Sequence, residues 1–136
     1  MSAIVEHLVF PNTRDVLYEL IDGAEFAGRT VTAYYQLPVD YSMQAQGSPV
    51  VLIYTAGGTQ GWIDRVDRAT VEVYAPGTAA VEVAEGIAAA VVGQGHDLAA
   101  GYVDEIVCDI TPHDVPHASE AVNLARAGYL DTTRPI

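Results

Sequence analysis

The fold of this chain is decided by residues 49–94, which read PVVLIYTAGGTQGWIDRVDRATVEVYAPGTAAVEVAEGIAAAVVGQ. The apolar run 50–54 is β-branched at three of its five positions, which is typical of a strand that is covered on both faces. Three glycines within 57–61 permit the positive φ angles of a hairpin loop. Apolar and polar residues then alternate over 66–74, which predicts a returning antiparallel strand.

A helix is predicted directly after this hairpin. Pro76 and Gly77 end the strand, Thr78 is a suitable N-cap, and the glycine-rich segment that begins at Gly93 ends the helix. The apolar residues between these limits recur at helical spacing and form one stripe. They are Ala80, Val83, Ala84, Ile87 and Val91.

The N-terminal part of the chain predicts one more helix and one more strand. The helix is expected to begin with Asn12 or Thr13 as its cap and to end at Gly23. Alternating residues predict a strand at 30–37. The polar stretch 39–48 is expected to be a connection without regular structure.

The C-terminal part predicts two further strands, at 102–110 and 121–133, the second kinked at Gly128. A stiff turn bounded by Pro112 and Pro116 is expected between them. Together the elements predict an α+β (mixed α/β) fold in a single domain spanning residues 1–136. We expect one sheet of about four to five mostly antiparallel strands, packed with two helices.

The charge of the chain restricts its function. It carries 18 acidic and 6 basic residues, a formal net charge of −12, and every basic residue is an arginine. Without lysine there is no P-loop and no Schiff-base chemistry. The acidic balance disfavours binding to nucleic acid and to anionic membranes. We expect no signal peptide and no membrane span, and a protein that stays in the cytoplasm where it is made.

Several residues are candidates for a catalytic or metal site. His113 and His117 are four apart, but prolines beside both favour a loop over a zinc-binding helix. Cys108 lies in an apolar strand pattern, which favours a small core residue over a nucleophile. The acids at 104, 105 and 109 favour a solvated strand edge over a carboxylate pair. We therefore expect no catalytic residue, no metal and no cofactor.

The tip of the central hairpin is the best candidate for an interface. Trp62, the only tryptophan, either anchors a contact with another subunit or folds back onto its own sheet. Arg65 and Arg68 either meet acids of a neighbour or form ion pairs within the subunit. Gly57 and Gly58 give the loop its reach, and a cradle for an anion is the less common use of such glycines.

These features together resemble one family. A capped N-terminal helix precedes a strand ending in Leu37-Pro38, then the segment SPVVLI at 48–53, the Gly57-Gly58 pair, a strand ending in VYA at 73–75, an alanine-rich helix and a late β pair. This pattern is similar to that of the tail terminator proteins of long-tailed (siphovirus) phages, in particular those of actinobacterial hosts. The similarity extends over most of the chain.

The resemblance implies a non-enzymatic structural protein of the virion. Such proteins form a ring, usually a homohexamer, that caps the tail tube, stops its polymerisation and presents the surface that docks to the head. Implied partners are the tail tube protein on one face and a neck or head-completion protein on the other. DNA passes through the bore without specific binding, and no membrane is involved. The implied location is the head-proximal end of the tail, after assembly in the host cytoplasm.

Two other classes of function stay open at this point. One is a different neck or tail protein, such as a stopper, a connector or a tube subunit. The other is a small α+β enzyme or ligand-binding module, which would require a pocket with convergent titratable groups.

Overall fold

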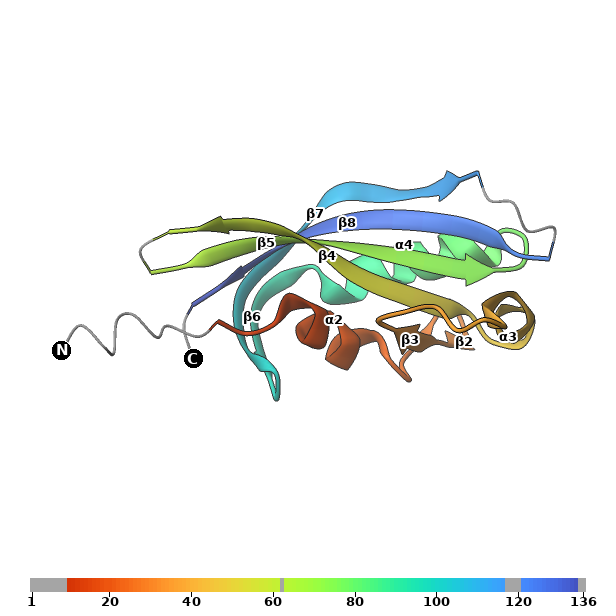
Figure 1. The fold of residues 1–136 in the computed structure, drawn as a ribbon, viewed down its shortest axis with the longest axis horizontal. Helices are drawn as coiled ribbons and strands as arrows, with labels where there is room; N and C mark the ends of the chain where they lie inside the picture. The colour runs from red at the N-terminus through yellow and green to blue at the C-terminus, as the bar shows by residue number, and fades with distance from the viewer. Residues whose placement is uncertain (1–9, 62, 117–120, 135–136) are drawn as a thin grey trace.

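A curled six-stranded sheet forms the centre of the fold in the computed structural model, which describes residues 10–61, 63–116 and 121–134 (Figure 1). The strand order is β3-β4-β5-β8-β7-β6. In that order the bounds are Thr32–Tyr34, Val50–Gln60, Arg65–Ala75, Asn123–Thr133, Gly101–Val115 and Gly93–Leu98. Only β3 and β4 run parallel; the other neighbours are antiparallel.

The remaining described elements are three helices and a small hairpin. The helices are α2 (Thr13–Ile21), α3 (Tyr41–Gly47) and α4 (Ala79–Val91), and β1 (Glu25–Phe26) pairs with β2 (Arg29–Thr30) as a two-stranded sheet. The α+β class is confirmed. The expected count of strands and helices is too low, because short and glycine-rich elements escaped the periodicity argument.

Both predicted helices are confirmed, and the predicted side-chain cap is confirmed for the first of them. Asn12 caps α2, and its side-chain oxygen accepts hydrogen bonds from the backbone N–H groups of Arg14 and Asp15. The apolar stripe of α4 is buried as predicted. Thr78 precedes α4, but its hydroxyl bonds the carboxylate of Glu82 at 3.1 Å instead of a backbone amide.

The stretch 39–48 was predicted wrongly, because it contains α3. This short helix is held by side chains: Gln44 donates to Asp40 at 2.9 Å and accepts from the hydroxyl of Tyr34 at 2.7 Å. Its residue Ala45 packs into a second, smaller core with Val50 and other residues of the sheet. The strand expected at 30–37 is correspondingly short, since only β2 and β3 form there.

The central hairpin is longer than expected. β4 continues through the two glycines to Gln60, and the turn lies at 61–64, where the Gly61 N–H donates to the Asp64 carbonyl at 2.8 Å. A register shift between Thr55 and Gly58 marks a bulge. The outer half of the hairpin projects well beyond the helices (Figure 1).

The stiff turn expected at 112–116 is also wrong, because β7 runs through Pro112 to Val115. Register shifts in β7 accommodate this long strand against β8. Gly128 pairs in register with Thr70 on one side and Ile110 on the other. The predicted break after α4 contains strand β6, whose sequence GQGHDL shows no apolar alternation.

The main core lies between the sheet and the pair of helices α2 and α4. Ala69, Val71 and Val73 of β5 point into it as predicted and are all buried. They pack against Val16 and Leu17 of α2 and other fully buried residues of the same cluster. The opposite face of β5, β8 and β7, here called the open face, is covered by α3 at one end only. None of the helices in the described ranges has the length and apolar character needed to cross a membrane.

Candidate assembly surfaces

The two glycines selected from the sequence shape the hairpin from inside strand β4. Gly57 has φ +78° and lies in the bulge, where an L side chain would be strained. A Cβ on Gly58 would lie 1.8 Å from the carbonyl oxygen of Val66 on β5. The sequence predicted that these glycines form the hairpin loop. They lie instead within strand β4, where they fix the course of the hairpin.

Two described residues at the hairpin tip carry exposed side chains, the apolar Ile63 and the acidic Asp64. Ile63 is 62% exposed, and Asp64 beside it is also exposed. Trp62 lies outside the described residues. Whether it anchors an interface or packs on its own sheet therefore stays open, and the interface remains a prediction. An exposed isoleucine at the end of a projecting hairpin is a natural contact point for another molecule.

Both arginines of the hairpin make ion pairs within their own subunit. Arg65 lies 3.0 Å from Asp67, and Arg68 pairs with Asp109 across the sheet. Their side chains are only about half covered, at 41% and 51% exposed. Both arginines therefore form ion pairs within the subunit, which was one of the two alternatives. A further contact with a neighbouring subunit stays a prediction.

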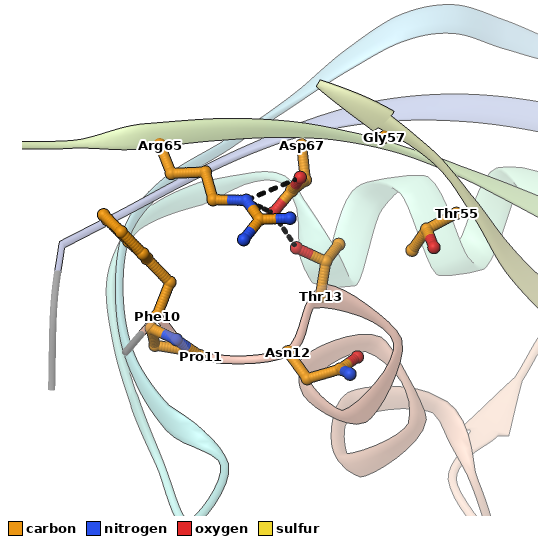
Figure 2. A pocket seen from close by; sticks show the side chains of 8 residues that line it. All are labelled: Phe10, Pro11, Asn12, Thr13, Thr55, Gly57, Arg65 and Asp67. Carbon is orange, nitrogen blue, oxygen red and sulfur yellow. Dashed lines mark hydrogen bonds and ion pairs between the residues drawn. The ribbon is translucent and has the colours of Figure 1, made fainter. Parts of the chain in front are cut away.

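A small polar pocket lies under the base of the hairpin, beside the N-terminus of α2 (Figure 2). Its volume is about 160 Å³. Figure 2 shows the Thr13 hydroxyl aimed at Asp67, to which it donates at 3.3 Å, and the Arg65 guanidinium beside the same carboxylate. The ring of Phe10 lies 5.9 Å from the Arg65 guanidinium carbon. The pocket thus ties the start of α2 to the hairpin.

Behind this pocket lies a buried acidic pair that the sequence analysis missed. Asp67 and Asp131 are opposite each other in the pairing of β5 with β8, and Asp131 is fully buried. Neither carboxylate oxygen of Asp131, nor the Thr133 hydroxyl, has a hydrogen-bond partner among the described residues. Burial, with the Asp67 charge adding to it, raises the pKa of Asp131 to about 6.

A second buried acid lies on the open face, where it is fully paired. Glu72 accepts from Arg126 Nε at 2.7 Å and Nη2 at 2.5 Å, and from the hydroxyls of Tyr54 and Tyr74 at 3.2 and 3.0 Å. The hydrogen bond to Glu72 raises the pKa of Arg126. Burial raises the pKa of Tyr74, with the Glu72 charge adding to it. This charge-paired network suits structural support of the open face.

An apolar hollow opens on the same face, next to that network. Its volume is about 200 Å³. The lining residues are Thr70, Ile110, His113, Arg126, Ala127 and Gly128. We call it the open-face pocket.

The charges are distributed unevenly between the two sides of the sheet. On the open face, the acids Glu72 and Asp109 are each paired with an arginine. The helix side carries exposed acids on or next to α2 and α4, and only one of them, Glu82, has an arginine within 4 Å. These helix-side acids are Asp15, Glu19, Asp22, Glu82 and Glu85.

The other residues weighed from the sequence do not come together. The three carboxylates at 104, 105 and 109 have separate partners: Arg134, Gln94 and Arg68. They form no carboxylate pair, but the expected solvated edge holds only for Asp109, because Asp104 and Glu105 lie where β7 is paired with both β6 and β8. His113 lies in β7 and not in the expected loop, with Nδ1 2.9 Å from the Thr111 carbonyl oxygen. His117 lies outside the described residues.

Cys108 was expected in the core and lies at its margin, partly buried. It is half-buried against the main core, and its Sγ donates to the Ile110 carbonyl at 3.3 Å. Burial raises the pKa of its thiol, which lowers the thiolate fraction that a nucleophile needs. Across the described ranges, no group of three or more His, Cys, Asp or Glu side chains is arranged to hold a metal ion.

No protein-family model matches this chain, and a search of the curated proteins finds no match either.

Proposed function

We propose that this protein is a structural component of a phage virion, a tail terminator that forms a ring on the end of the tail tube. The observation that carries the proposal is the projecting β4–β5 hairpin, which is exposed from Thr55 to Gly61 and holds Ile63 at its tip. A ring requires each subunit to present two different patches to its two neighbours. A hairpin that reaches away from its own body provides one of them.

The charge distribution supports the same proposal. A ring around passing DNA must not bind the DNA, and a surface with an excess of acids repels phosphates. The helix-side acids supply such a surface, while the arginines at 65, 68 and 126 are engaged with acids of their own subunit. We assign the helix side to the DNA-facing or solvent-facing surface and the open face to contacts between subunits.

In this role the ring stops tube polymerisation, meets the tail tube protein on one side and meets a neck or head-completion protein on the other. No cofactor takes part. The proposal rests on the resemblance in sequence and on the hairpin together.

The test is negative-stain microscopy of the purified chain, with sedimentation velocity on the same sample. Closed rings of uniform size support a terminator. Open filaments would instead support a tube subunit. A chain that stays monomeric over the micromolar range would overturn the ring and favour a ligand-binding module. If rings form, their addition to polymerising tube protein of the same virus should shorten the tubes.

A further inference from the structure

We propose that the open-face pocket receives the hairpin tip of a second copy of this chain, with Ile63 in the pocket and Asp64 facing His113 and Arg126. This inference deepens the proposed ring, on which it rests, by naming the two patches that meet.

The pocket exists because position 128 is glycine. A Cβ there would lie 3.3–3.4 Å from three side-chain atoms of Ile110, so any larger residue would fill the space. Ile110 forms one wall and is 47% exposed. An apolar wall left open on a rigid sheet is a suitable seat for an apolar side chain.

The tip supplies a side chain of the required kind. Ile63 is largely exposed in its own subunit, and full burial of an isoleucine is worth about 1.5–3 kcal/mol. The tip cannot reach the pocket of its own subunit. Thr70 in the pocket lies six residues along β5 from Asp64, a distance of about 20 Å for an extended strand. The partner must therefore be another molecule.

Charge favours a second copy of this chain at this place. Two molecules of net charge −12 repel each other over most of their surface. At the open-face pocket the acid Glu72 is neutralised by Arg126, whose side chain is still 39% exposed, and His113 is exposed beside it. Asp64 of an incoming tip meets a guanidinium group and an imidazole ring instead of an unpaired acid.

The contact is also of the type that a ring requires. The tip and the pocket are different patches of one chain, so their contact is heterologous and repeats from copy to copy. Each subunit then gives one tip and receives one.

A charge exchange tests the contact. Asp64→Arg places a cation opposite His113 and Arg126 and is expected to weaken self-association by roughly tenfold or more. The double variant Asp64→Arg/His113→Glu restores an opposite-charge pair and should recover part of that loss. Asp97→Arg, which makes the same charge change on an exposed residue of β6, is the matched control and should assemble as well as the wild type. Thermal melts of all variants verify folding.

A cysteine pair gives a second readout that does not depend on affinity. In a Cys108→Ala background, Ile63→Cys/Ile110→Cys should form a ladder of disulfide-linked oligomers under a mild oxidant, and each single cysteine variant should give at most dimers. Rings that form without the ladder, and that tolerate Asp64→Arg, would overturn the contact and leave the ring itself intact. A wild type that never self-associates would overturn both. A ladder together with rescue by the double variant would establish the contact.

Discussion

Asp67 and Asp131 lie directly opposite each other on β5 and β8, on the core side of the sheet, where Asp131 is fully buried. Like charges directly opposite each other destabilise a sheet, and an unpaired buried carboxylate is costly. Arg65 pairs with Asp67, and the Thr13 hydroxyl donates to Asp67 at 3.3 Å. The same hydroxyl lowers the pKa of Asp131, but by less than burial raises it. The folded chain is therefore more stable when the Asp131 carboxyl group carries a proton.

The first prediction concerns the pH dependence of stability. Because the pKa of Asp131 is raised from 3.8 to about 6 in the folded chain, the native state holds this proton more tightly than the unfolded state. The stabilisation is complete below about pH 4 and is lost as the pH rises through about 6, at about 1.4 kcal/mol per pKa unit. Asp131→Asn should thus be more stable than the wild type at pH 8, by up to about 3 kcal/mol.

The measurement is urea unfolding at pH 4.5 and pH 8 at one protein concentration. Asp97→Asn, at an exposed site on β6, is the matched control and should follow the wild type at both pH values. An Asp131→Asn variant that loses stability at pH 8 would show that the ionised carboxylate has a role in the fold.

For this buried pair, the sequence predicts the inward position of one residue but not the pairing of the two. The alternation of β5 was recognised at Ala69, Val71 and Val73, and two residues further back it places Asp67 on the same inward face. The alternation thus predicts an inward-facing charge at Asp67, but it does not identify the residue opposite. Asp131 could not be linked to it, since the pairing of β5 with β8 joins positions 64 residues apart.

Other elements gave no local signal at all. β6 has no apolar alternation and is stabilised by its pairing with β7. Proline in β7 argued for a turn, yet an edge position tolerates a residue without an N–H, and β7 has no β6 partner beyond Ile106. Where packing against one face sets the pattern, as in α4, the prediction was correct.

The second prediction compares a buried ion pair with an exposed one. Glu72 is nearly inaccessible and accepts hydrogen bonds from two tyrosines and Arg126. Glu72→Gln should lower the free energy of unfolding by about 1–3 kcal/mol, because Arg126 loses its partner but regains water. Asp109→Asn breaks the exposed pair with Arg68 and should cost less than about 1 kcal/mol. Urea unfolding of both variants measures the difference, and equal losses would contradict the burial argument.

The third prediction concerns the course of the hairpin. Gly58→Ala places a methyl group against the Val66 carbonyl, so strands β4 and β5 must separate locally, at a cost of about 1–3 kcal/mol. Gly47→Ala at the end of α3 meets nothing within 4 Å and should be neutral or slightly stabilising. Thermal melts provide the comparison. A Gly58→Ala variant as stable as Gly47→Ala would mean that the bulge adjusts freely.

The fourth prediction follows from the sequence of the hairpin tip. If Trp62 anchors a contact between subunits or with the tube, Trp62→Ala should weaken association by about 2 kcal/mol or more and leave the melting temperature of the monomer nearly unchanged. Sedimentation velocity and thermal melts are run on the same samples. A variant that assembles normally refutes the contact, and one that unfolds assigns Trp62 to the core.

The last prediction is that the helix-side acids keep the protein away from DNA. The free chain should show no gel shift in the range of about 10⁻⁴–10⁻⁶ M where non-specific binders act at physiological salt. Glu82→Lys/Glu85→Lys reverses two exposed charges on α4 and should bring binding into view as salt is lowered, with a steeper salt dependence than Glu82→Gln/Glu85→Gln. Both pairs remove the Arg29 contact of Glu82, so their difference isolates the sign of the charge. Binding by the unmodified chain at physiological salt would overturn the assignment of this surface, because a bore that holds DNA would obstruct its passage.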